Sequence, residues 1–264
     1  MRRWVHTTFG LAVTVSVITL AAGLEARPDK KPARVASLVG DDDVPRPPRC
    51  PRGMAAVTGH GHAFCIDRYE ASVVEVTEGG KTVPHSPYEP VTGLKVRARS
   101  VPGVVPQGYI SGLEAKAACE AAGKRLCDPE EWELACRGRH ATTYPYGDEE
   151  KPGRCNAERR KTHPVVELFH DSEEPFHDFA KMNDPRINQL PQTLTKTGAR
   201  ASCKSSFGAF DMVGNLHEWT SDPKGQFRGG YYMDTHKNGD GCGYKTVAHD
   251  VSYRDYSIGF RCCK

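Results

Sequence analysis

The sequence predicts a single exported domain with two helices, few short strands and much irregular chain, held together by disulfides. Three observations carry this prediction. All ten cysteines lie from Cys50 onward, after an N-terminal export signal, and an even cysteine count in an exported chain indicates disulfides. Two segments carry complete helix-capping signals. The rest of the chain is rich in glycine and proline, with short apolar pieces between turn signals.

Residues 1–26 are predicted to be a secretory signal peptide. Arg2 and Arg3 precede an apolar run, Phe9–Ala22, that ends among small residues. The run is shorter than the about 20 apolar residues of a transmembrane helix, so no stable membrane insertion is expected after cleavage. The mature protein is therefore expected to be secreted or periplasmic.

Residues 27–49 are predicted to be a solvated linker, because they are dense in proline and charge and include an aspartate run at Asp41–Asp43. Residues 50–264 are long enough for one domain with a substantial core. The formal net charge of +3 is too small to indicate a nucleic acid or an acidic membrane surface as a partner.

The first predicted helix lies in the segment SGLEAKAACEAAG. Ser111 can cap its N-terminus, Glu114 completes a capping box, and Gly123 ends it. Cys119 lies late in this helix, where a disulfide can tie the helix to a distant strand.

The second predicted helix lies in DPEEWELACRG and has the same kind of signals. Asp128 is the candidate cap, Pro129 suits the first helical position, Glu131 completes the capping box and Gly138 stops the helix. Cys136 occupies a late position in it, as Cys119 does in the first helix.

Common catalytic signatures are absent from the sequence, which has no GxSxG elbow, P-loop, HExxH or EF-hand loop. It has no CxxC pair either, so a zinc knuckle or a thioredoxin-type site is not expected. His249 with Asp250 has two interpretations: an oriented imidazole pair of the kind used in general base catalysis, or a structural pair.

Other histidines give weaker signals. His163, His170 and His177 recur at intervals of seven, but prolines interrupt any helix between them, so spacing does not predict that they converge on a metal. His60 and His62 lie near the start of the domain and are expected in a surface loop.

The segment GAFDMVGNLHEWTSD combines Asp211, Asn215 and Glu218 with two glycines on a turn-rich path. Hard oxygen ligands from side chains and backbone carbonyls over a short span suit Ca²⁺. A turn rich in Asp and Asn and locked by a buried Trp219 is the alternative. The chemistry of these residues leaves both open.

Several motifs resemble the formylglycine-generating enzyme family, also called sulfatase-modifying factors. They are AFCIDRYEAS, AACEAAGKRLCDPEEWELACRG, TYPYGDE with CNA, GAFDMVGNLHEWTSD, FRGGYY and IGFRC, in family order over Cys50–Cys262. The resemblance implies one α+β domain related to C-type lectins, with low regular secondary structure, bound Ca²⁺ and bridging disulfides.

The resemblance also implies disulfide pairs. The two helix cysteines and the two late cysteines match structural positions of the family, which gives the pairs Cys119–Cys262 and Cys136–Cys242. For the six unmatched cysteines we expect the pairs Cys50–Cys65, Cys155–Cys203 and Cys127–Cys263.

For calcium, the family's site on the GNxxEW turn maps onto Asp211, the carbonyls of Gly214 and Leu216, and Glu218. A second site maps onto Asn156 and the carbonyl of Ala157, with Asp178 and Asp184 as candidates for its remaining ligands.

The sequence departs from the family at its copper centre. The family's oxidases bind Cu(I) between two cysteines that precede the cysteine matched by Cys242, and soft thiolates are what Cu(I) selects. Here those positions hold Asp234 and Lys237, and no cysteine lies between Cys203 and Cys242. Copper is therefore not expected.

Two further departures change the substrate groove: the serine of RGGS is Tyr231, and the tryptophan of GNxWEW is His217. The preferred hypothesis is a non-oxidase binding or accessory domain with a protein, peptide or glycan ligand. The alternative is an oxidoreductase of the formylglycine-generating type with a rebuilt metal site, such as His217 with His236, acting on a protein or peptide.

Overall fold

The computed structural model describes residues 45–157, 160–170 and 176–264. The predicted signal peptide and the linker up to residue 44 lie outside the described residues, and residues 45–49 have no regular secondary structure. In the described part of the chain, no helix has the length and apolar character needed to cross a membrane.

Every regular element of this domain is short, as the glycine and proline content predicts. The longest helix has ten residues. The helices are α1 (Gly112–Ala121), α2 (Pro129–Arg137), α3 (Pro164–Phe169) and α4 (Phe179–Met182), with 3-10 turns η2 (Gly138–His140), η3 (Ile187–Gln189) and η4 (Gly241–Gly243). The strands are β1 (Met54–Gly59), β2 (His62–Asp67), β3 (Ser72–Val76), β4 (Thr82–Pro84), β5 (Val96–Arg99), β6 (Arg125–Leu126), β7 (His217–Trp219), β8 (Phe227–Arg228), β9 (Lys245–Thr246), β10 (Ile258–Phe260) and β11 (Cys262–Cys263).

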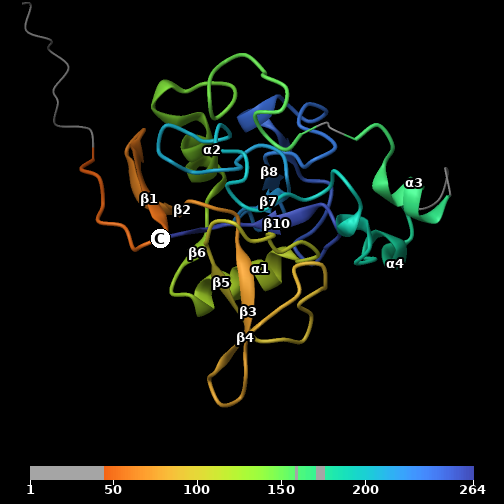
Figure 1. Cartoon of the computed structure of the whole chain (residues 1–264). Coiled ribbons are helices and arrows are strands. Elements are labelled where there is room, and N and C mark those ends of the chain that lie inside the picture. Colours follow the sequence, from red (N-terminus) through yellow and green to blue (C-terminus); the bar gives the residue numbers. More distant parts are fainter. Residues whose placement is uncertain (1–44, 158–159, 171–175) are drawn as a thin grey trace, which may run out of the picture. The chain divides into compact units, whose positions relative to one another are not determined.

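The strands form three small sheets, with orders β1-β2-β11-β6, β10-β7-β8-β9 and β4-β3-β5. Only the β10–β7 pair among the described strands is parallel, so the second of these sheets is mixed and the other two are antiparallel. The C-terminal strand β11 lies between β2 and β6, which carries the end of the chain into the first sheet (Figure 1). Sequence-distant motifs meet because of this closure.

Both predicted helices form where their capping signals place them. Ser111 caps α1 and makes a reciprocal capping box with Glu114. At α2, the backbone N–H of Asp128 donates to the Glu131 carboxylate at 3.0 Å. Gly123 and Gly138 both have φ of +68°, a left-handed conformation that glycine adopts without strain, so the two helices end there.

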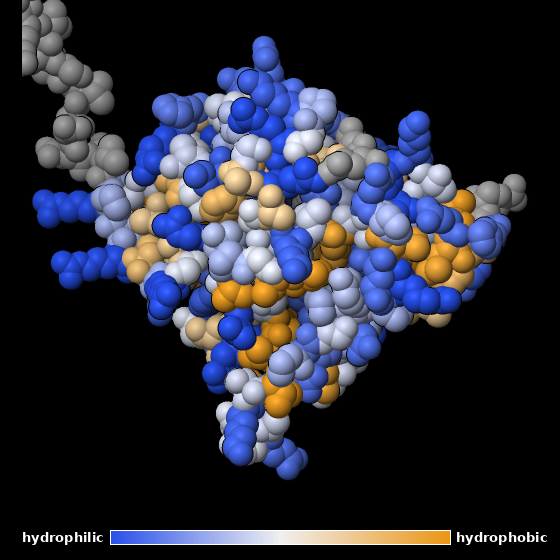
Figure 2. Space-filling view, in the orientation of Figure 1, coloured by the Kyte–Doolittle hydropathy of each residue, from blue (hydrophilic) through white to orange (hydrophobic). Residues whose placement is uncertain are grey.

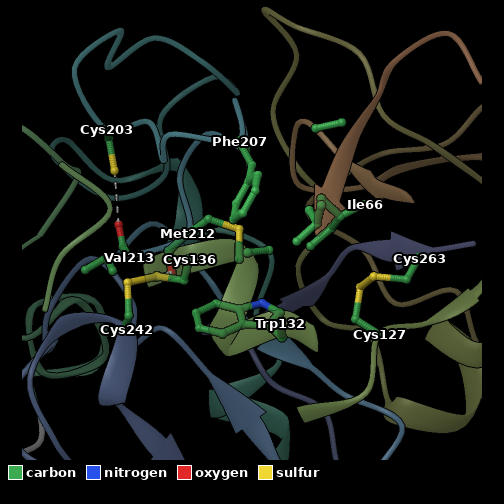
Figure 3. Packing of buried hydrophobic residues seen from close by; sticks show 14 of the residues in the cluster. Ile66, Cys127, Trp132, Cys136, Cys203, Phe207, Met212, Val213, Cys242 and Cys263 are labelled. Atoms are coloured by element: carbon green, nitrogen blue, oxygen red, sulfur yellow. Dashed lines mark hydrogen bonds between the residues drawn. A yellow bond between two sulfur atoms is a disulfide. The ribbon is translucent and has the colours of Figure 1, made fainter. Parts of the chain in front are cut away.

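Five disulfides join all ten cysteines: Cys50–Cys65, Cys119–Cys262, Cys127–Cys263, Cys136–Cys242 and Cys155–Cys203. These are the five pairs expected above. Figure 3 shows the fully buried Trp132 lying between the Cys136–Cys242 and Cys127–Cys263 bonds. The disulfides are therefore part of the hydrophobic core and tie α1 and α2 to the C-terminus.

Two of these bonds constrain nearly the same loop, which predicts a non-additive effect on stability. Seven residues lie between Cys119 and Cys127, and Cys262 is adjacent to Cys263. Removing Cys127–Cys263 alone therefore releases a short loop and costs about 3 kcal/mol. Removing Cys119–Cys262 as well releases a longer loop, which runs through the remaining Cys136–Cys242 bond, and costs about 4 kcal/mol more.

Chemical denaturation of the single and double Cys→Ala pair variants measures this difference. The control is removal of Cys50–Cys65, whose cost we expect to be the same in either background. Equal costs for the first and second removals of the nested pair would contradict the shared-loop interpretation.

Candidate functional site

A pocket of about 440 Å³ opens beside β7, β8 and β10. We call it the aromatic pocket, because its walls carry the rings of His163, Phe176, His217, Phe227, Tyr231, Tyr244, His249 and Tyr256. Its size is in the range of small-molecule and side-chain binding sites.

Three of the positions at which the sequence departs from the copper oxidases line this pocket: His217, Tyr231 and Lys237. The rings of His217 and Tyr231 are 4.9 Å apart, so these two replacements pack against each other. Asp234, at the other copper position, accepts hydrogen bonds from the backbone N–H groups of His236 and Lys237 at 3.0 and 2.9 Å. A capped turn therefore occupies the segment where the family holds its metal.

His217 is enclosed by rings. Its centroid lies 4.8 Å from Phe227 and 5.3 Å from Tyr244, in addition to the contact with Tyr231. The side chain is buried, and its Nδ1 atom has no hydrogen-bond partner. Burial lowers the pKa of His217 from 6.5 to about 3, so the ring is neutral at physiological pH.

His163 connects α3 to the opposite wall of the pocket. As the N-cap of α3, its Nδ1 accepts from the backbone N–H of Val165 at 3.3 Å. Its Nε2 lies 2.9 Å from the Tyr256 hydroxyl and 3.3 Å from that of Tyr231. Burial, helped by the charge of Arg160, lowers the pKa of His163 to about 4. The neutral ring therefore keeps its proton on Nε2, because Nδ1 is an acceptor.

This role of His163 could not be predicted from the sequence, because its partners lie 68 and 93 residues away. His170 and His177 are exposed, at the end of α3 and before α4. Within the described residues, no three side chains of His, Cys, Asp or Glu are arranged to hold a metal ion. The seven-residue histidine spacing therefore marks no metal site there.

Three further histidines have other surroundings. His60 and His62 are both exposed; His60 lies in the β1–β2 turn, as expected, whereas His62 is the first residue of β2. The ring of His249 stacks on Tyr253 at 3.6 Å, while Asp250 accepts from Ser252, so these contacts give the two residues separate partners.

His236 does not join His217 in a metal site. Its Nδ1 faces Asp240 at 2.8 Å and its Nε2 faces Glu150 at 3.4 Å. His217 has its ring among Phe227, Tyr231 and Tyr244 instead. The histidine pair named above for a rebuilt metal site is therefore not assembled in this structure.

A buried polar cluster lies behind the pocket and contains the predicted calcium side chains. Both oxygens of Glu218 accept from Arg261 at 2.6 Å, and one also accepts from the Trp132 indole at 2.7 Å. Asp211 accepts from the backbone N–H of Gly198 at 2.6 Å, and burial raises the pKa of Asp211 to about 6. Both carboxyl groups are buried.

Sequence reasoning missed Glu70 as a member of this cluster. Its carboxylate accepts from the Asn215 amide at 2.7 Å and from the Leu216 backbone N–H at 3.2 Å. Burial raises the pKa of Glu70 well above its usual range, and the charges of Asp211 and Glu218 raise it further. Three carboxyl groups, of Glu70, Asp211 and Glu218, therefore act on the guanidinium of Arg261. Oxygen is the donor type that suits a hard divalent cation, but among the described residues these three side chains do not converge as a metal site.

The second predicted calcium segment adjoins the first. The Asn156 amide donates to the side chain of Asn215 at 2.9 Å, and its carbonyl accepts from the Asn215 backbone at the same distance. Gly214, with φ of +78°, allows this approach, since an added Cβ would lie 2.3 Å from the Asn156 oxygen and 3.4 Å from the Cβ of Ala157. Gly214 and Asn215 therefore hold the two predicted calcium segments, the turn at 211–218 and residues 156–157, against each other.

The two candidate aspartates for that second site have other partners. Asp178 caps α4 through the backbone N–H groups of Ala180 and Lys181, and Asp184 pairs with Arg186 at 2.6 Å. These contacts do not bring either aspartate to Asn156. Both calcium sites therefore remain predictions.

Because the buried His217 has an unpaired nitrogen, we expect that its replacement by an apolar ring will stabilise the protein. His217→Phe should raise the free energy of unfolding at pH 7 by about 1 kcal/mol, because it removes a buried unsatisfied nitrogen among aromatic rings. It should also reduce acid sensitivity. The unfolded chain protonates His217 below its ordinary pKa of 6.5, whereas the fold resists protonation down to about 3, so stability is lost between these values, by about 5 kcal/mol at most.

Denaturant unfolding of the wild-type protein and the variant across pH 7 to about pH 4 measures both effects. His62→Gln, which removes an exposed histidine, is the control and should follow the wild-type profile. A His217→Phe variant that is less stable, or that loses stability in acid as steeply as the wild-type protein, would contradict the buried neutral imidazole.

Comparison with known proteins places the chain in a family. Residues 38–264 match the family model described as sulfatase-modifying factor enzyme 1-like domain. The inactive C-alpha-formylglycine-generating enzyme 2 of Mus musculus is 30% identical over 139 residues, 50% of this chain and 39% of that relative. The formylglycine-generating enzyme of Mycobacterium tuberculosis is 32% identical over 100 residues, 38% of this chain and 27% of the relative.

Hercynine oxygenase of Mycobacterium tuberculosis is 28% identical over 127 residues, 47% of this chain and 23% of that enzyme. The matched segments span less than half of each of these relatives. Among solved structures, PvdO from Pseudomonas aeruginosa has a TM-score of 0.44 and 16% identity, covering 77% of this chain and 80% of that one. The chain belongs to the sulfatase-modifying factor (formylglycine-generating enzyme) family, as a divergent member without the copper-binding cysteine pair.

Proposed function

We propose that this protein is an exported, non-oxidase member of the family that acts as a binding or accessory protein, with the aromatic pocket as its ligand site. One observation carries the proposal. All ten cysteines are consumed by five disulfides, so no thiolate is left for Cu(I). The two family copper positions, Asp234 and Lys237, instead form a capped turn at the pocket.

The name of one relative is consistent with the proposed loss of oxidase activity. The mouse relative is named as inactive, although other relatives are named as a formylglycine-generating enzyme and an oxygenase. The histidine-based alternative lacks support, because the nitrogens of His236 face Asp240 and Glu150. A chemical assay is therefore the appropriate test.

The surface beside the pocket supports a binding role. Phe176, which lines the pocket, is 42% exposed, and Phe179 is 50% exposed. Figure 2 shows apolar residues gathered beside α3 and α4, with hydrophilic residues around them. Apolar surface rimmed by polar groups is typical of interaction sites. A protein, peptide or glycan is the proposed ligand, and the relationship to C-type lectins stays a prediction.

The first test measures aldehyde formation. The purified full chain, incubated with copper, O₂ and a sulfatase-type cysteine peptide, should form no formylglycine, since it has no free thiolate to bind Cu(I). Mass spectrometry of the peptide detects the aldehyde, and a copper-loaded formylglycine-generating enzyme serves as the positive control. Catalytic turnover by the native chain would overturn the proposed function.

We propose in addition that Ca²⁺ stabilises the domain through Asp211, Glu218 and the carbonyls of Gly214 and Leu216. The support is the buried excess of carboxylates around Arg261. The second predicted segment, Asn156 with the Ala157 carbonyl, is proposed to share this role.

Asp211→Asn tests the calcium proposal better than a change at Glu218, because loss of Glu218 would also unpair the buried Arg261. The wild-type protein should melt at a higher temperature with Ca²⁺ than with a chelator, and Asp211→Asn should abolish that difference. Asp250→Asn, at an exposed position outside both predicted calcium segments, is the control and should retain it. The calcium proposal would be contradicted if the melting temperature of the wild-type protein did not change with Ca²⁺. It would also be contradicted if Ca²⁺ raised the melting temperature of Asp211→Asn as much as that of the wild-type protein.

A further inference from the structure

The aromatic pocket contains a buried carboxylate that forms no ion pair with a lysine or arginine among the described residues. Asp255 lines the pocket and is 5% exposed. One of its oxygens accepts from the backbone N–H and the hydroxyl of Ser257 at 2.8 and 2.7 Å, and the other accepts from the Tyr253 hydroxyl at 2.8 Å. Burial raises the pKa of Asp255, whereas these three neutral donors and the nearby His249, which also lines the pocket, favour its ionised form.

A second carboxylate, Asp234, acts on the same rings. It holds the Tyr244 hydroxyl at 3.1 Å, and its other hydrogen bonds come from neutral backbone N–H groups. Burial, with smaller contributions from the charges of Asp255 and Asp234, raises the pKa of Tyr231 to about 12. The walls of the pocket therefore experience negative charge from two carboxylates.

The basic residue on the described wall of the pocket is Lys237, which is exposed. Water and salt screen an exposed charge, whereas Asp255 acts from a buried position of lower dielectric. Three imidazoles line the pocket. The ring of His163 is neutral at physiological pH, because burial lowers its pKa to about 4. The buried ring of His217 has an Nδ1 atom without a hydrogen-bond partner, and the ring of His249 stacks on Tyr253.

Aromatic rings and a carboxylate together favour cations, because ring faces carry the negative part of a quadrupole. We propose that the aromatic pocket binds the basic side chain of a partner protein or peptide, an alkylammonium or guanidinium group placed among the tyrosine rings and beside Asp255. This proposal rests on the proposed binding function and specifies its ligand class. A ligand with a carboxylate group would instead depend on Lys237. Substitutions of Asp255 and Lys237 should therefore have opposite effects on cationic and anionic ligands.

The first experiment uses the wild-type full chain and three capped tripeptides of the form Gly-X-Gly. X is lysine, its neutral isostere norleucine, or glutamate, and the histidine and tyrosine ring signals are followed by NMR titration. Lysine should bind about tenfold more tightly than norleucine, and should shift the His217 and Tyr231 signals. Equal binding of lysine and norleucine, or tighter binding of glutamate, overturns the proposal.

The second experiment has a closely matched pair of variants. Asp255 and Asp250 both accept the backbone N–H and hydroxyl of the serine two residues later, at 2.6–2.8 Å. Asp250 is exposed and does not line the pocket. Asp255→Asn should weaken lysine binding about tenfold, whereas Asp250→Asn should leave it unchanged. Equal affinities of the two variants count against a role for Asp255.

Lys237→Gln separates the two charge classes. It should leave binding of the lysine peptide unchanged or strengthen it. If the pocket instead binds anions, the variant should lose binding of the glutamate peptide. If the lysine peptide fails to bind but a glutamate peptide shifts the same ring signals, the ligand class is wrong while the binding function stands. If no peptide binds and the chain forms aldehyde with copper, the proposed function itself fails.

Discussion

A buried guanidinium holds together the parts of this domain that lie far apart in the sequence. Arg261, fully buried between β10 and β11, donates to both oxygens of Glu218 in β7. It also donates to the backbone carbonyls of Asp67 at the end of β2 and of Phe210. Trp132 of α2 completes the contacts of Glu218. Removal of either charged partner would leave an uncompensated charge in the interior.

This interaction explains why three sequence motifs occur together. The arginine of IGFRC, the glutamate of NLHEW and the tryptophan of DPEEW form one hydrogen-bonded cluster. Successive residues of a strand point to opposite faces. When Glu218 faces the cluster, its neighbour His217 therefore faces the aromatic pocket. The ion pair thus fixes the position of a pocket residue without touching the pocket.

The sequence predicted local features well and distant contacts poorly. The helix caps were predictable, because each capping signal lies within one helical turn of its partner. The pairs Cys119–Cys262 and Cys136–Cys242 came from the family resemblance, since spacing alone does not select among the many pairings of ten cysteines. The other three pairs join cysteines that match no family position, and the structure contains all five.

Glu70 and His163 were missed for one physical reason. Each acts on residues about 70 to 150 positions away, Glu70 on Asn215 and His163 on Tyr231 and Tyr256. No periodicity or spacing encodes such contacts, which depend on how β11 closes the first sheet and brings the C-terminal segment inward. The departures at positions 217, 231 and 237 could be identified from the sequence, but their convergence on one pocket could not.

The central claim is that the scaffold has kept its disulfides and replaced its copper centre with a pocket. Titration of the native full chain with Cu(I), in competition with a chromophoric Cu(I) chelator, tests it most directly. The reduced and denatured chain, which exposes all ten thiols, provides the positive control. We predict that the native chain leaves the copper with the chelator. Stoichiometric capture of one Cu(I) by the native chain would contradict the claim.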